Sequence, residues 1–193
     1  MRGGSLLRVA KARPVAGLSE QAPYALAAAR VVETRAAELS EHAAGVLDTA
    51  DIERVHDMRV ATRRLRAALE VFEPCFSRKP FKAALREVKE LADALGERRD
   101  RDVTIMALAD VAVGLGTSDR AGVESLIAAL RDEQAAANES LAAFVSEERV
   151  AGLRGRLEEL ARDAEGRAGA GTVDEPGEAE LAGASASNGG GVG

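Results

Sequence analysis

The sequence predicts an all-α protein, an antiparallel helical bundle that resembles a four-helix bundle and contains about six helices. Aromatic residues make up only 3% of the 193 residues, so the core must be built from Ala, Leu and Val. Such a composition favours closely packed helices over a β-sandwich, which draws on aromatic and β-branched residues. In addition, no segment shows the sustained alternation of polar and apolar residues that is typical of a half-buried strand.

Helix start and stop signals divide the first half of the chain. Pro23 can open a first helix, whose apolar pattern continues to about residue 47. Asp51 can cap a second helix, which continues to the residue before Pro74. Residues 75–79 then form a connection.

The second half contains further signals of the same kind. We expect Pro80 to open a third helix that ends at Gly96, because glycine commonly follows the last turn of a helix. A fourth helix then covers about 99–113, a fifth extends from Ser118 to about residue 145, and a sixth covers about 147–164. Short connections of this kind favour antiparallel neighbours.

Composition separates three parts of the chain. Residues 1–19 look irregular, residues 20–165 carry the helical pattern, and residues 166–193 are rich in Gly, Ala and Ser. We expect the last part to be a disordered acidic tail, because it lacks apolar periodicity. The tail has one basic and four acidic residues, so it accounts for −3 of the formal net charge of −6.

Several classes of protein are disfavoured by simple counts. The single cysteine, Cys75, excludes an internal disulfide framework and a Cys-rich zinc site. No run of residues has the length and apolar character of a membrane span, and the N-terminus lacks the apolar stretch of a signal peptide. We therefore expect a soluble cytoplasmic protein that uses no cofactor and no metal.

Positive charge is concentrated in residues 52–101, which hold 13 of the 26 Lys and Arg residues and carry a net charge of +4. A helix turns about 100° per residue, which places four basic side chains of the second helix in one stripe. The stripe consists of His56, Arg59, Arg63 and Arg66. It borders the apolar face around Leu65, whereas Arg64 stands apart and faces solvent or a neighbouring helix.

The predicted third helix repeats this pattern. Lys82, Arg86 and Lys89 share one face, and Arg99 follows soon after the helix. If the second and third helices are antiparallel neighbours, both sets of cations can line one groove. Guanidinium groups match phosphate oxygens bidentately, so a linear phosphate polymer is a natural partner for such a groove.

Two runs of residues resemble the CHAD family, the conserved histidine α-helical domain. The first is Val-His-Asp-Met-Arg-Val-Ala-Thr-Arg-Arg-Leu-Arg at 55–66, and the second is Leu-Ala-Asp-Ala-Leu-Gly-Glu-Arg-Arg-Asp-Arg-Asp-Val at 91–103. The resemblance covers about residues 20–165 and implies a helical domain whose basic residues line a central channel for inorganic polyphosphate. By position, His56, Arg59, Arg63 and Arg66 match the first motif, and Lys82, Arg86 and Lys89 match basic positions of the following helix.

The sequence also departs from the family pattern. The fuller form of the family has a second helical half with its own His-x-x-Arg motif, but the only other histidine here is His42, which has no such motif. The chain thus resembles one half of that domain. A closed channel would need a second chain, for example in a homodimer; otherwise the groove stays open. No Glu-x-Glu-x-Lys signature of the associated triphosphate-tunnel domain is present, so no catalytic domain is inferred.

These observations together predict a non-enzymatic module that binds inorganic polyphosphate in the cytoplasm, with polyphosphate granules as one expected place. The predicted binding residues are His56, Arg59, Arg63, Arg64, Arg66, Lys82, Arg86, Lys89 and Arg99. Two alternatives remain: an accessory or regulatory subunit of a polyphosphate- or nucleotide-processing enzyme, and a helical scaffold that binds an acidic protein. We do not expect nucleic acid as a partner, because the chain is acidic overall and offers few aromatic side chains for stacking.

Three roles are open for His56. It can donate to phosphate or orient a neighbouring arginine, it can be a structural residue, or it can ligate a metal. Metal ligation is the least favoured role, because His42, Asp51 and Asp57 make a poor set of partners.

Overall fold

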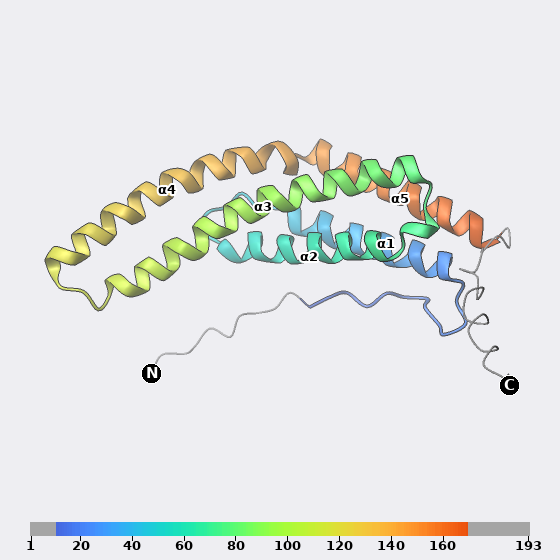
Figure 1. Ribbon diagram of the computed structural model, residues 1–193, viewed down its shortest axis with the longest axis horizontal. Coiled ribbons are helices and arrows are strands. Elements are labelled where there is room, and N and C mark those ends of the chain that lie inside the picture. Colours follow the sequence, from blue (N-terminus) through green and yellow to red (C-terminus); the bar gives the residue numbers. More distant parts are fainter. Residues whose placement is uncertain (1–10, 170–193) are drawn as a thin grey trace, which may run out of the picture.

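The computed structural model describes residues 11–169, and every regular element within this range is helical (Figure 1). The elements are α1 (Tyr24–Ala43), α2 (Ile52–Val71), the short 3₁₀ helix η1 (Glu73–Cys75), α3 (Arg78–Ala112), α4 (Thr117–Val145) and α5 (Glu147–Gly169). The prediction of an all-α bundle is therefore confirmed.

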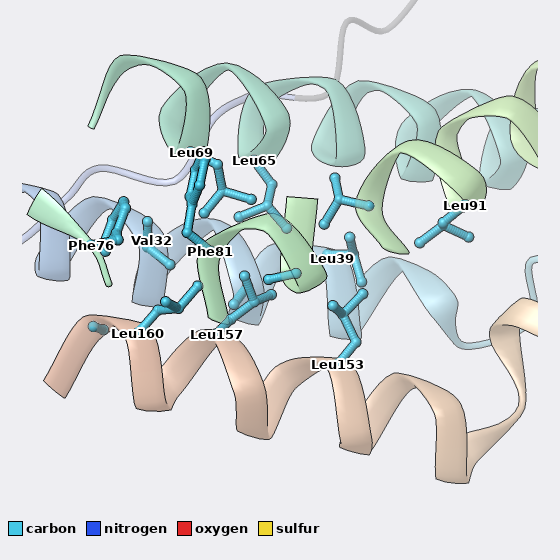
Figure 2. Packing of buried hydrophobic residues seen from close by; sticks show 14 of the residues in the cluster. Val32, Leu39, Leu65, Leu69, Phe76, Phe81, Leu91, Leu153, Leu157 and Leu160 are labelled. Carbon is cyan, nitrogen blue, oxygen red and sulfur yellow. The ribbon is translucent and has the colours of Figure 1, made fainter. Parts of the chain in front are cut away.

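The core is enclosed by α1, α2, α5 and the first half of α3. Helix α1 packs against both α2 and α5, and α2 packs against α3, which confirms that these two are antiparallel neighbours (Figure 1). Figure 2 shows how leucines from different helices meet in this core, among them Leu39 of α1, Leu65 of α2 and Leu157 of α5. The apolar stripe expected on the second helix thus faces the core. The neighbouring face of α2, which carries the basic stripe, is exposed at Arg59, Arg63 and Arg66.

The prediction that the third helix ends at Gly96 is wrong. Helix α3 is 35 residues long and continues through Gly96, so the predicted third and fourth helices are one, and residues 11–169 form five α-helices. Gly96 does not adopt a positive φ, and the side chains around it, Leu95 and Arg98, are fully buried. A glycine inside a helix costs about 1 kcal/mol relative to alanine. Burial of the flanking residues outweighs this cost.

The second half of α3 and the first half of α4 extend beyond the other helices as a two-helix arm (Figure 1). Within the arm, Ala112 and Ile127 are buried between the two helices. The turn between them, residues 113–116, contains two glycines, Gly114 and Gly116. Because only two helices meet here, most arm side chains stay exposed.

Helix α5 begins after a one-residue break at Ser146, as the sequence predicts. The Ser146 hydroxyl accepts a hydrogen bond from the backbone N–H of Arg149 at 3.4 Å, which is typical of an N-cap. Helix α5 then continues to Gly169, so residues 166–169, assigned to the tail from the sequence, are helical. The rest of the predicted tail, 170–193, and residues 1–10 lie outside the described residues.

Candidate functional site, a basic groove between α2 and α3

A groove of about 350 Å³ lies between α2 and α3. Its α2 wall carries three of the predicted arginines, which repeat at intervals of four and three residues and therefore share one helix face. The groove is lined by Arg59, Arg63, Arg66, Ala67 and Glu70 of α2 and by Ala92 and Asp93 of α3. All of these residues except the half-buried Ala92 are exposed, so the groove is open to solvent along its length.

Two of the three arginines carry uncompensated charge. Within residues 11–169, neither Arg59 nor Arg63 forms an ion pair or a side-chain hydrogen bond, although both side chains are exposed. Lone guanidinium groups one helical turn apart repel each other. An anion placed between them would relieve that repulsion and accept their hydrogen bonds.

The third arginine is held by a carboxylate. Arg66 Nε donates to Glu70 Oε1 at 2.9 Å, and Lys89 Nζ of α3 lies 3.7 Å from the same oxygen. The hydrogen bond from Arg66, supported by the charges of Arg66 and Lys89, lowers the pKa of Glu70 below its ordinary value. Glu70 therefore stays ionised and connects the two walls of the groove.

The remaining predicted residues of α3 lie beside the groove and do not line it. Lys82 is exposed and has no ion-pair partner within the described residues. Arg86 is 73% exposed, and its Nε is 3.8 Å from a carboxylate oxygen of Glu90. Together with Lys89 they continue the basic surface from the groove toward the first turn of α3, as their spacing predicts.

His56 and Arg64 also lie outside the groove wall. Both side chains are half-buried on α2, and Arg64 interacts with other groups of the protein. The other histidine, His42, lies in the last turn of α1. Among residues 11–169, no group of three or more His, Cys, Asp or Glu side chains is arranged to hold a metal ion.

Arg99 is buried and contacts the start of α2, unlike the exposed arginines that line the groove. Its side chain is 8% exposed, Nη1 donates to the backbone carbonyl of Ile52 at 3.0 Å, and Nη2 is 3.6 Å from Glu53 Oε1. These contacts attach the first turn of α2 to α3. Arg99 thus positions the helix that carries the groove arginines, and it is not among the residues that line the groove.

A buried polar cluster lies next to Arg99, and sequence reasoning did not single it out. Arg98 is fully buried and forms an ion pair with Asp102, whose Oδ1 also accepts from Gln134 Nε2 of α4 at 2.6 Å. Burial and, secondarily, the charge of Arg99 lower the pKa of Arg98. The cluster joins α3 to α4 where the arm begins.

Sequence reasoning also missed one carboxylate of the groove wall. Asp93 lies opposite the arginines and has no ion-pair partner among the described residues. A signal was available, because Asp93 follows Lys82, Arg86 and Lys89 at the same helical spacing. The groove is therefore basic on its α2 wall and mixed on its α3 wall.

The fold and the groove together define an all-α domain with an open, arginine-lined groove. The chain belongs to the CHAD domain family, whose model matches residues 30–186. This family is linked in general to polyphosphate binding, and the CHAD domain alone is not a known catalytic domain.

No significant match is found among curated proteins. None of the helices within residues 11–169 combines the length and the apolar character needed to cross a lipid bilayer.

Proposed function

We propose that this protein is a non-enzymatic module that binds inorganic polyphosphate in the groove between α2 and α3. The observation that carries the proposal is the row of Arg59, Arg63 and Arg66 along one wall, with the first two unpaired among the described residues. The row extends for about 10 Å along the helix axis, as expected for contact with several successive phosphates of one strand. Membership of the CHAD family supports the choice of polyphosphate as the anion.

The mechanism is charge neutralisation. A polyanion brings condensed counterions, and arginines that replace these counterions release them into solution, so binding weakens as the salt concentration rises. Guanidinium groups add bidentate hydrogen bonds to the phosphate oxygens. Lys82, Arg86 and Lys89 extend the contact beyond the groove for a longer polymer, and Arg99 keeps α2 in place.

The test is a titration of long-chain polyphosphate, tripolyphosphate and duplex DNA against two variants. The first variant carries Arg59→Ala, Arg63→Ala and Arg66→Ala. The matched control removes three exposed arginines that form no ion pair among the described residues and lie away from the groove. It carries Arg131→Ala, Arg149→Ala and Arg162→Ala.

We expect long-chain polyphosphate to bind the wild type and the control similarly and the groove variant at least ~10-fold more weakly, with a clear dependence on salt. No binding by the wild type at low salt would overturn the proposal. A strong preference for tripolyphosphate would favour an accessory role for a polyphosphate- or nucleotide-processing enzyme. If the wild type binds none of the three anions, the search for a partner moves to acidic proteins.

We also propose that two copies associate so that a second chain covers the open side of the groove. The molar mass from light scattering, measured with and without polyphosphate, tests this assembly. A strict monomer under both conditions would contradict it.

In cells, a fluorescent fusion is expected to gather at polyphosphate granules, and the groove variant is expected to remain diffuse.

A further inference from the structure

We propose that the acidic segment 174–180 of this chain binds the basic surface formed by the start of α3 and the groove, and competes there with the anionic ligand. The nature of that competing ligand rests on the proposed function; the contact itself does not. Three features carry the inference: where α5 ends, which charges lie there, and how far the following residues reach.

The end of α5 is fixed beside the start of α3. Asp163 Oδ2 accepts hydrogen bonds from the hydroxyl of Ser77 at 2.8 Å and from its backbone N–H at 3.3 Å. Arg167 Nη2 donates to the same hydroxyl at 2.6 Å. Ser77 directly precedes α3, so the chain leaves α5 next to the first turn of that helix (Figure 1).

Exposed cations gather at this end of the molecule. Arg78, Lys79 and Lys82 lie in the first two turns of α3, and none of them has an ion-pair partner among residues 11–169. Arg86 follows one turn later. The pair formed by Lys89 and Glu70 lies about 18 Å along the helix axis from Ser77.

The chain beyond Gly169 is acidic and long enough to reach these cations. Residues 170–193 contain no basic residue and four acidic ones, which fall within seven positions. They are Asp174, Glu175, Glu178 and Glu180. An extended chain spans about 3.3 Å per residue, so Asp174 can reach about 17 Å from Gly169 and Glu180 about 36 Å. These distances cover the basic surface from Lys82 to the groove.

A tethered segment is a strong competitor because its local concentration is set by the linker and reaches the millimolar range for short flexible linkers. A ligand binds only the fraction of molecules whose site is open, so its apparent affinity falls by that fraction. If the segment covers the site nine-tenths of the time, the apparent affinity falls about tenfold. Salt screens the contact and therefore reduces the effect.

The experiment compares the wild type with two variants of the whole 193-residue chain. The tail variant carries Asp174→Asn, Glu175→Gln, Glu178→Gln and Glu180→Gln. The matched control makes the same four-charge change on α4 and carries Asp119→Asn, Glu124→Gln, Asp132→Asn and Glu139→Gln. We expect the tail variant to bind long-chain polyphosphate at least ~5-fold more tightly than the control at low salt, with a smaller difference at high salt. Equal affinities of the two variants would overturn the competition.

A second measurement needs no ligand. Backbone amide chemical shifts of Lys82, Arg86 and Lys89 are compared between the wild type and the tail variant. Shift changes at these residues support the contact, and changes confined to the last turn of α5 overturn it. If none of the proteins binds polyphosphate while the shift changes are present, the proposed ligand is wrong and the tail contact stands.

Discussion

Glu70 in the α2 wall of the groove contacts Lys89 of α3, which lies beside the groove, with Oε1 of the carboxylate 3.7 Å from Nζ of the lysine. The same oxygen accepts from Arg66 at 2.9 Å. One carboxylate thus interacts with two of the cations that an anionic ligand would contact, Arg66 and Lys89. Its removal is the simplest way to make the groove more basic without altering an arginine.

We predict that Glu70→Gln tightens polyphosphate binding by about 2- to 5-fold, because Arg66 and Lys89 lose the competing negative charge. Isothermal titration at fixed low salt measures the change. Glu139→Gln, on the exposed face of α4, is the control for a unit change in net charge. Identical affinities of the two variants would show that Glu70 does not restrain the groove.

The lowered pKa of Glu70 also predicts a pH dependence of stability. Its folded-state pKa lies below the unfolded value, so its contribution is complete above the unfolded pKa and is lost as the pH falls through the folded pKa. The side chain is 44% exposed, so we expect no more than ~0.5 kcal/mol. Urea unfolding should show the wild type slightly more stable than Glu70→Gln at pH 7, with the difference shrinking as the pH falls below about 4. A difference that persists in acid would contradict this origin.

Gly96 offers a test of the continuous helix α3. A Cβ added there meets nothing within 4 Å, and the backbone is helical, so Gly96→Ala should raise the free energy of unfolding by about 0.5–1 kcal/mol. Gly45→Ala is the contrast, because Gly45 has φ +72° and its added Cβ would meet the Arg54 guanidinium at 2.8 Å. We expect that variant to be destabilised by about 1 kcal/mol or more. Destabilisation by Gly96→Ala would indicate a break in the helix.

The buried ion pair at the base of the arm should be sensitive to the loss of one partner. Asp102→Leu leaves the buried charge of Arg98 unpaired, and we expect a loss of about 3 kcal/mol in denaturant unfolding. The double variant Arg98→Met with Asp102→Leu removes both charges and should recover most of that loss. A double variant as unstable as the single one would assign the loss to packing and not to the unpaired charge.

Cys75 is predicted to be unreactive in the folded protein. Its side chain is buried, and burial raises the pKa of the thiol, which disfavours the thiolate that reacts with alkylating reagents. Iodoacetamide at pH 8 should modify the native protein at least ~10-fold more slowly than the urea-unfolded protein. Equal rates would show that the segment around η1 opens readily.

The fold class and the arginine row could be predicted because both depend on local periodicity. On α2, the positions of Leu65 and Leu69 determine which face is buried, and the arginines at 59, 63 and 66 follow on the neighbouring face. The break before Glu147 could also be predicted, because it depends on a local feature: Ser146 caps the helix that follows.

Other features depend on partners far away in the sequence. The burial of Arg99 is explained by the carbonyl of Ile52, 47 positions earlier, and no pattern around Arg99 indicates that contact. Gly96 carries a stop signal that tertiary packing overrides. Asp93 was missed for a different reason, since the sequence pattern was followed for its cations only.

In a single copy, whose groove no second chain covers, the open side has a consequence for how a polymer would be captured. A tunnel admits a chain only by one of its ends, whereas a groove can take up an internal stretch laid in from the side. A polymer longer than the groove would leave free length on both sides, so several molecules could bind one strand next to each other. Occupancy would then rise with polymer length even though each protein contacts the same few phosphates.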